Sequence, residues 1–523
     1  MSQQFRDLAE LWMKDKLGTC VSAVGGNLLS NGAASLSLLC FRLKLPINLV
    51  RRALCVLLHF GLVEARLEER NRVSYVFVQR RFVHLLRVAR YVLAAKTLYA
   101  QAGEAIALEL AVNARLTLQQ ILHRSKQLGL HSKFLQVFKE MVRAQFIMRS
   151  PTVIATDGFP VADESQAPLA FVLPDDFEQA SAETVEASSS NRKRKAPTEA
   201  ASPTDMLWQL NVDQFECYLR DHLILTSIAS FADATTVEVA TFMLKMSALK
   251  STQRASVSAS MAASDIYRLA ESSNSGGALS RSVIENRLKF MADQQNMIVC
   301  KSGDSGGGIF SVDFGRAVQL LCRRSLETIV KEKFDKKGLR IFRLLLDKGF
   351  LEQNDIDKLA MVDHKESRHL VHQMLNQHYV NVKEMSKTSD YVPARTHYLF
   401  YVDLLRQARL QQELCFRTLR NLQARRQHDR ERCRSLVERH EKMLTIVANI
   451  RSDTAIDDDT KQRQMNEVDE QYMTPAEKQT LHQYEASKTK LYCAEAAVQE
   501  TLFIWSTYID MTQPQHEKPA NAS

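Results

Sequence analysis

The sequence predicts a mainly α-helical protein with small β-hairpins, organised as four small units in series and a helical hairpin towards the C-terminus. The first observation is an order of elements, two short amphipathic helices followed by one or two short strands, that occurs four times. The second is a 4-3 spacing of mostly apolar residues that runs from Tyr401 to Ile450 and is typical of a long coiled-coil helix. The four units are spaced too irregularly for a solenoid, so each is expected to be a separate small domain.

The first unit is expected to contain two helices between residues 35 and 59, preceded by a helical segment at 5–29. Ser35 has a hydroxyl suited to the start of the first helix, which ends near Lys44. Pro46 suits the first turn of the second helix, where its missing N–H costs nothing. The apolar residues expected to form the inner face of this second helix are Ile47, Val50, Leu54, Leu57 and Leu58.

The opposite face of that helix is polar and basic, and it carries Arg51 and Arg52. Gly61 is suited to end the helix. Two strands, at 62–67 and 73–78, are expected to follow, joined by a charged turn. Helix, turn, helix and hairpin in this order form the winged version of the helix-turn-helix.

The same order recurs in three further places. The expected helix pairs lie at 117–128 and 131–145, at 264–272 and 280–294, and at 354–362 and 365–377, and the strands that follow them lie at 146–149, within 297–314, and at 379–385 and 398–402. Residues 169–173 are a candidate additional strand of the second unit. Residues 301–308 are rich in glycine, but no Gly-Lys-Ser/Thr follows them and no helix begins there. We therefore interpret them as the tip of the third hairpin, where glycine permits positive φ.

The C-terminal part is expected to form an antiparallel pair of helices. The first follows the 4-3 spacing, an acidic break lies at 453–460, and the second helix begins at Pro475. The end of the second helix, at 481–509, is the more apolar and contains Trp505. Because a two-helix hairpin has few neighbours to cover such a surface, we expect this end to pack against the protein's own winged units.

The formal net charge of +9 is distributed unevenly along the 523 residues. Residues 1–150 contain 22 Lys and Arg against 9 Asp and Glu, so the rest of the chain is slightly acidic. Such an excess is suited to following the phosphates of DNA, and equally to facing an acidic protein partner. The best candidates for nucleic-acid contact are the arginines of the second helix and the hairpin, which are Arg51, Arg52, Arg66, Arg70 and Arg72.

Residues 175–206 consist mainly of Pro, Ser, Ala, Asp and Glu, so they are expected to form a disordered linker that cannot bury enough apolar surface to fold. A basic run lies within them at Arg192, Lys193, Arg194 and Lys195. Such a run is a candidate nuclear import signal, and the alternative is that it is only part of a solvated linker. Residues 249–263 are rich in Ser, Ala and Thr and are expected to form a mobile loop. No apolar run approaches the roughly 20 residues that a membrane-spanning helix needs, so no membrane association is expected.

No catalytic arrangement stands out in the sequence. The nine cysteines have no C-x-x-C spacing, and we interpret all of them as reduced thiols. Catalytic magnesium would need an acidic triplet of the D-x-D-x-D kind, which the chain lacks. We therefore expect no metal, no cofactor and no small-molecule substrate.

Several short stretches resemble one known family. They are Lys96-Thr97-Leu98-Tyr99 with Gly103-Glu104, residues 301–308, residues 340–345, Ala360-Met361, and residues 393–396 with Tyr398-Leu399. With the order of the units, they make the chain similar to the large tandem-winged-helix subunit of DNA-directed RNA polymerase III, the third subunit, which is related to the alpha subunit of TFIIE. The resemblance covers nearly the whole chain and is weakest at 151–206 and 247–263.

The resemblance implies a nuclear, non-catalytic polymerase subunit. In this family the subunit joins two smaller subunits in a heterotrimer on the polymerase clamp. The heterotrimer contacts DNA and helps to open promoters and start transcription of small untranslated RNAs. The residues by themselves also allow a stand-alone winged-helix DNA-binding transcription regulator or a protein-interaction scaffold. Stoichiometric co-purification with a multi-subunit assembly would distinguish the subunit from these.

The expected domain organisation follows from these assignments. The four winged-helix domains are placed at 1–90, 91–174, 207–314 and 315–402, the linker at 175–206, the coiled-coil hairpin at 403–511 and a tail at 512–523. A long amphipathic helix at 91–114, with Leu93, Leu108 and Val112 among its apolar residues, connects the first two domains.

Overall fold

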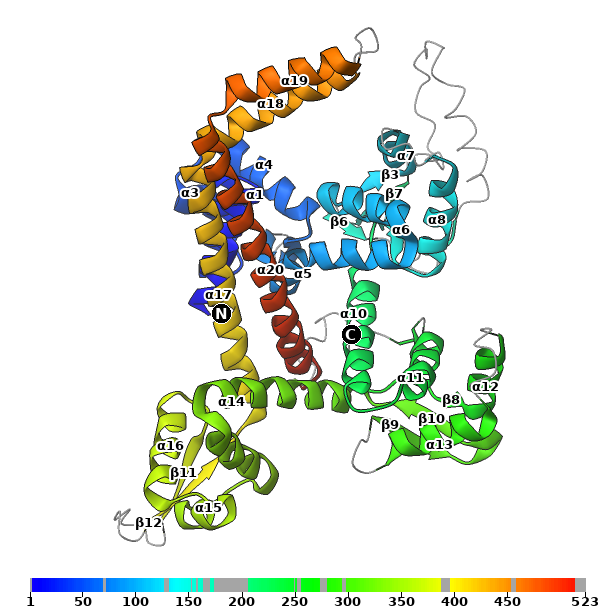
Figure 1. Cartoon of the computed structure of the whole chain (residues 1–523), viewed down its shortest axis with the longest axis vertical. Coiled ribbons are helices and arrows are strands. Elements are labelled where there is room, and N and C mark those ends of the chain that lie inside the picture. Colours follow the sequence, from blue (N-terminus) through cyan, green and yellow to red (C-terminus); the bar gives the residue numbers. More distant parts are fainter. Residues whose placement is uncertain are drawn as a thin grey trace. The chain divides into compact units, whose positions relative to one another are not determined.

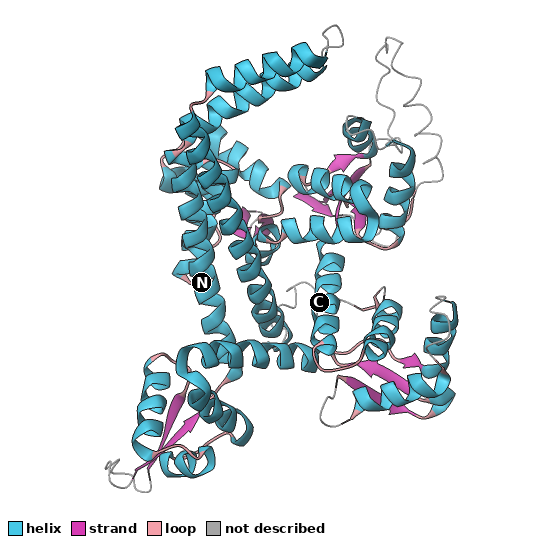
Figure 2. Ribbon diagram, in the orientation of Figure 1, coloured by secondary structure: helices cyan, strands magenta, loops and turns pink. Residues whose placement is uncertain are grey.

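The structure, a computed structural model, is mainly helical with small sheets (Figure 1, Figure 2). It describes residues 2–68, 72–126, 131–151, 153–156, 159–162, 170–173, 206–248, 250–251, 255–272, 280–293, 298–386, 396–452 and 458–512. The chain divides into two compact units, Met1–Leu54 with Arg409–Phe503, and Cys55–Ala408 with Ile504–Ser523. Within the described residues the strands form sheets of only two or three strands. The predicted class, mainly α with small β-hairpins, is confirmed.

The N-terminal part of the first unit is helical. Its elements are α1 (Gln3–Lys16), α2 (Thr19–Asn31), α3 (Leu36–Leu43) and the beginning of α4 (Ile47–His59). Gly18 has φ 95° and divides the helical segment predicted at 5–29 into α1 and α2. The two helices approach closely at Gly26, where an added Cβ would lie 2.6 Å from Oε1 of Glu10. Phe5 of α1 is buried and meets Phe416 edge-on, with 5.2 Å between the ring centroids.

The C-terminal helices differ from the predicted pair of uninterrupted helices. They are α17 (Leu404–Arg432), α18 (Arg434–Ser452), α19 (Asp458–Tyr472) and α20 (Pro475–Thr512). The first predicted helix is interrupted at Cys433, and residues 458–460 of the predicted acidic break belong to α19 instead. α18 and α19 lie side by side (Figure 1). A small core contains Leu436 and Met443 of α18 and Leu481 of α20, and residues of α19 pack against it.

A charged residue lies on the predicted seam between α17 and α20. Arg426 forms an ion pair with Glu495 and lies over the ring of Tyr492, with 4.8 Å from Cζ to the centroid. The guanidinium is largely buried but paired, so it avoids the several kcal/mol that an isolated buried charge would cost.

The second compact unit, Cys55–Ala408 with Ile504–Ser523, contains the described wings. The first is the antiparallel pair β1 (Val63–Glu68) and β2 (Arg72–Phe77). The next helix pair is α7 (Leu118–Lys126) and α8 (His131–Arg143), accompanied by β3 (Leu116–Thr117), β4 (Ile147–Arg149), β5 (Val153–Thr156) and β6 (Phe159–Ala162). The strand β7 (Leu207–Leu210) lies between β3 and β4 in one sheet. Residues 207–210, predicted to open the third domain, therefore complete the sheet of the second, and 170–173 form no strand.

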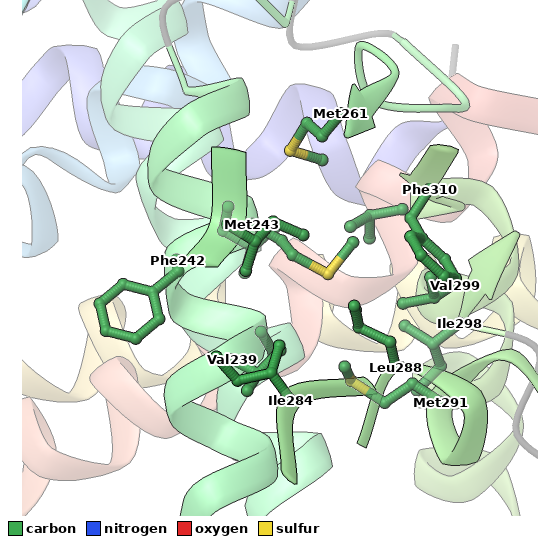
Figure 3. Packing of buried hydrophobic residues seen from close by; sticks show 14 of the residues in the cluster. Val239, Phe242, Met243, Met261, Ile284, Leu288, Met291, Ile298, Val299 and Phe310 are labelled. Atoms are coloured by element: carbon green, nitrogen blue, oxygen red, sulfur yellow. The ribbon is translucent and has the colours of Figure 1, made fainter. Parts of the chain in front are cut away.

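The third helix pair has its own core of aliphatic, methionine and aromatic side chains (Figure 3). Its elements are α10 (Val212–Ala229), α11 (Ala234–Ser247), β8 (Met261–Ala262), α12 (Ala263–Ser272), α13 (Arg281–Ala292), β9 (Val299–Gly303) and β10 (Ile309–Val312). Gly307 and Gly308 have φ 86° and 110° at the hairpin tip, which confirms the predicted role of the glycine-rich run. The predicted mobile loop is partly ordered by this wing, because Ser258 exchanges hydrogen bonds with Val312.

The fourth helix pair follows a long connecting helix. Its elements are α14 (Phe314–Lys348), α15 (Gln353–Ala360), α16 (His364–Asn376), β11 (Asn381–Ser386) and β12 (Thr396–Tyr401). β11 and β12 pair antiparallel as predicted. α14 begins at Phe314, in the core of the third helix pair, and its buried residue Phe342 belongs to the fourth helix pair. One long helix is therefore shared by the two helix pairs.

Three helices that precede a strand end in the same way. A residue with positive φ follows α4, α8 and α16, namely Gly61, Gln145 and His378. In each case the next residue donates its N–H back to the last helical turn, as Leu62 does to the carbonyl of Leu57 at 2.9 Å. This repeated cap directs the chain from helix into strand, although among the three only the cap after α4 uses glycine.

A second repeated feature is a break inside a long helix. α6 (Val88–Asn113) contains Ala100 at φ 55°, and α14 contains Asp335 at φ 58°. A glycine follows three residues later in both, at Gly103 and Gly338. An added Cβ at either glycine would lie 2.5 Å from the Cβ of the aromatic residue just before the break. The glycines are therefore required by the close approach across each break.

A buried ion pair fixes the end of α20 in the second unit. Arg87, between α5 (Gln79–Leu86) and α6, donates to Glu216 of α10 at 2.6 Å, and both side chains are only 2% exposed. Tyr91 donates to the other oxygen of the same carboxylate, and Arg87 also donates to Ser506 of α20. The neighbouring Trp505 is 1% exposed. This end of α20 packs against the protein's own helices, as the sequence predicted.

Candidate nucleic-acid interface

Helix α4 holds two of the predicted arginines on its outer face. Its first turn follows Pro46, whose carbonyl accepts from the N–H of Val50 at 3.3 Å. Val50 and Leu57 are buried, which leaves Arg51 and Arg52 on the exposed side. Neither guanidinium forms an ion pair within the described part of the chain. Both charges are therefore available to a polyanion.

The hairpin holds two more of the predicted arginines. Arg66 lies opposite Ser74 in the register of β1 and β2, and Arg72 begins β2 instead of lying in the turn. Both are exposed. The ion pair of Arg66 with Glu64, at 3.6 Å between exposed side chains, contributes little energy and leaves the arginine accessible. Arg70 lies outside the described residues.

One arginine of the basic N-terminal part is not available to DNA. Arg87 is buried in its pair with Glu216. Burial alone would raise the pKa of Glu216, but Arg87, His84 and the hydrogen bond from Tyr91 together lower it below its ordinary value. Burial lowers the pKa of His84 to about 4, so its imidazole is neutral near pH 7. These residues are structural, and the charge excess of residues 1–150 overstates the basic surface.

The sequence reasoning missed a set of exposed apolar side chains. Ile47 was predicted to face inward from α4 but is 46% exposed, because Val50 and its neighbours supply the buried face. On α3, Phe41 is 82% exposed. On α6, Leu108 and Val112 are exposed, while the buried face is formed largely by small residues. The spacing of apolar residues did not predict which of them would be exposed, since each of these helices has more apolar residues than its buried face can accommodate.

The described residues contain no group of three or more His, Cys, Asp or Glu side chains arranged to hold a metal ion. In the same residues no helix is both long and apolar enough to cross a membrane. The basic run Arg192, Lys193, Arg194 and Lys195 lies outside the described residues. The segment that runs from α3 through α4 to the hairpin thus offers exposed cations and apolar side chains.

Three family models, all of RNA polymerase III subunits, match parts of this chain. The family model described as the RNA polymerase III subunit RPC82 helix-turn-helix domain matches residues 7–68, and that of RNA polymerase III subunit RPC82 matches 160–321. The model of the POLR3C C-terminal winged-helix domain matches 326–402. DNA-directed RNA polymerase III subunit RPC3 of Bos taurus is 29% identical over 98% of this chain and 99% of that protein. The chain belongs to the RPC3/RPC82 family.

Other members of the RPC3/RPC82 family extend the comparison. The Homo sapiens RPC3 is 28% identical, again over 98% of this chain and 99% of that protein. The Dictyostelium discoideum rpc3 is 31% identical over 185 residues, which is 34% of this chain and 27% of that protein. The helix-turn-helix match contains Arg51, Arg52 and Arg66, and the winged-helix match contains α15, α16 and the β11–β12 wing.

Proposed function

We propose that the protein is a non-catalytic subunit of DNA-directed RNA polymerase III. It acts with two smaller subunits, as a heterotrimer on the polymerase clamp, in promoter opening and initiation on genes for small untranslated RNAs. The observation that carries this proposal is the similarity to RPC3 proteins along 98% of the chain. A non-catalytic role is supported by the sequence, which lacks the acidic triplet that would hold catalytic magnesium.

Affinity purification from the source cells tests this assignment. The tagged protein should elute with the other polymerase III subunits in equal amounts, and the purified assembly should transcribe a polymerase III template. The protein alone should make no RNA. Recovery of the protein as a single polypeptide that binds one defined duplex sequence would favour the stand-alone regulator.

We further propose that the chain forms four winged-helix domains and a C-terminal coiled-coil hairpin, with the second domain extended by residues 207–210. The repeated cap after α4, α8 and α16, and the pairing of β7 with β3 and β4, support these boundaries. The protein acts in the nucleus, and the run at 192–195 is its candidate import signal. Replacing the four basic residues with alanine should reduce nuclear accumulation of the free protein, and full nuclear localisation would assign import to another segment or partner.

DNA contact is proposed for the arginines of the first winged-helix domain. The five residues are Arg51, Arg52, Arg66, Arg70 and Arg72. Exposure and the lack of strong ion pairs at the described positions support this role. Because arginines that bind phosphates release counterions, replacing each such arginine should lower the slope of log affinity against log salt by roughly 1.

The measurement is duplex binding by the purified assembly over a salt series, with the five arginines replaced by alanine. The control replaces Arg268 and Arg434, whose side chains are 82% and 77% exposed on other helices. A slope that changes equally in the two variants, or in neither, would contradict DNA contact by these five arginines.

A further inference from the structure

Helix α3 exposes apolar side chains beside cations. Leu38 and Phe41 are three residues apart and therefore share one side of the helix, and Phe41 is 82% exposed. Leu39 is fully buried, so the opposite side anchors α3 to its unit. Arg42 and Lys44, at the end of the same helix, are exposed as well. We call Leu38, Phe41, Arg42 and Lys44 the α3 patch.

The apolar exposure continues into the next helix. Ile47 and Leu49, in the first turn of α4, are 46% and 37% exposed. A single exposed apolar residue is normal on a protein surface, but several within one short helix-turn-helix segment mark an interaction site. Phe41, the most exposed of these apolar residues, is an aromatic side chain, and large side chains that become buried at the centre of an interface contribute most of the binding energy.

The charge of the surrounding segment restricts the partner. From Lys16 to Val63 the sequence contains no Asp or Glu, while it contains five Lys and Arg. Lys44 adopts φ 53°, a left-handed conformation that glycine would take without steric cost. Lys44 therefore places a cation at this turn in a backbone conformation that glycine would adopt more readily. A partner with negative charge is complementary to Arg42 and Lys44.

We propose that the α3 patch docks an acidic amphipathic segment of another polymerase subunit, with an apolar side chain against Phe41 and carboxylates against Arg42 and Lys44. This inference rests on the proposed function. DNA is the less suitable occupant, because phosphates satisfy the cations but leave Leu38 and Phe41 exposed to water. A protein segment with apolar and acidic residues on one face satisfies both.

Site-specific photo-crosslinking in the assembled polymerase tests the proposal. A photoreactive phenylalanine replaces Phe41, and in a matched control it replaces Tyr492, an aromatic residue of α20 that is 48% exposed. Position 41 should crosslink to a segment of another subunit rich in Asp, Glu and apolar residues, and position 492 should not crosslink to that segment. Crosslinks from position 41 to DNA, to a basic segment, or to nothing in an assembled complex would overturn the proposal.

A second measurement does not depend on the polymerase. The purified protein is titrated with a labelled helical peptide of Leu, Phe and Glu, with the same peptide carrying Lys in place of Glu, and with a single-stranded oligonucleotide. The acidic peptide should bind, and Phe41→Ala should weaken it about tenfold or more without lowering the melting temperature. Arg42→Ala with Lys44→Ala should weaken it most at low salt. Phe41-dependent binding of the oligonucleotide without binding of the acidic peptide would assign the patch to nucleic acid.

The two assays separate two kinds of failure. A protein that does not co-purify with polymerase subunits, yet binds the acidic peptide through Phe41, would contradict the proposed function and leave the α3 patch as a docking surface. A protein that assembles normally but neither crosslinks at position 41 nor binds the peptide would contradict the docking proposal alone.

Discussion

Removal of the carboxylate from the Arg87–Glu216 pair should destabilise the junction of α5, α6, α10 and α20. Glu216→Ala leaves the guanidinium of Arg87 in a site where its side chain is 2% exposed. It also removes the acceptor of Tyr91. Loss of one partner of a buried ion pair costs about 3–5 kcal/mol, because the remaining charge is desolvated and uncompensated.

Hydrogen exchange followed by mass spectrometry measures this change locally, at the helices that contact the pair. With about 1.4 kcal/mol per factor of ten, amides of α10 that exchange by local opening should exchange roughly a hundred to several thousand times faster. The last turns of α20 should also lose protection, since Arg87 donates to Ser506.

Two comparison variants make the result decisive. Arg124→Ala breaks the pair with Glu109, whose side chains are 41% and 29% exposed, and should cost less than about 1 kcal/mol. Arg87→Met combined with Glu216→Leu removes both charges and should be closer to the wild type than Glu216→Ala. Equal exchange in Glu216→Ala and Arg124→Ala would refute the structural role assigned to the buried pair.

Three further predictions concern the rest of the fold. The pKa of His84 falls from 6.5 to about 4 on folding, so the unfolded chain binds the extra proton and stability should decrease as pH falls through this window, by up to about 3 kcal/mol. A urea series should show a flatter pH dependence for His84→Asn. Gly338→Ala should cost about 1–3 kcal/mol in thermal melts through overpacking, and Asp335→Gly should stabilise by relieving its positive φ. Trp505→Ala should cost about 3–5 kcal/mol, more than deletion of the α18–α19 tip, and the reverse order of melting temperatures would contradict its role as the anchor.

The sequence alone determined the elements whose signals are local. Ser35 caps α3 through its hydroxyl, Gly61 ends α4, and Gly307 and Gly308 form the tip of the third hairpin, all as predicted. Apolar spacing located the four helix pairs to within a few residues. These features depend on the backbone freedom and hydrogen-bonding groups of one short segment, so no distant residue is needed to specify them.

A local rule also predicted that Arg51 and Arg52 lie on the exposed side of α4. Arg51 and Arg52 lie opposite the buried side of α4, as the helical period requires. The predicted inner face of α4 was wrong at Ile47, which is exposed. Where a helix has more apolar residues than its packed face needs, the period fits more than one orientation. The neighbouring elements then decide which residues are left facing water, and Phe41 was missed for the same reason.

Only the tertiary structure decided the partners that lie far apart in the chain. Glu216 follows Arg87 by 129 positions, and Ser506 follows it by 419. Nothing in the basic segment around Arg87 distinguishes a buried arginine from a DNA-binding one, because the difference is made by a carboxylate on another helix. β7 likewise pairs with β3 and β4, which lie far before it in the sequence. Local pattern fixes which residues can form a helix or strand, whereas burial and pairing depend on what the rest of the chain brings against them.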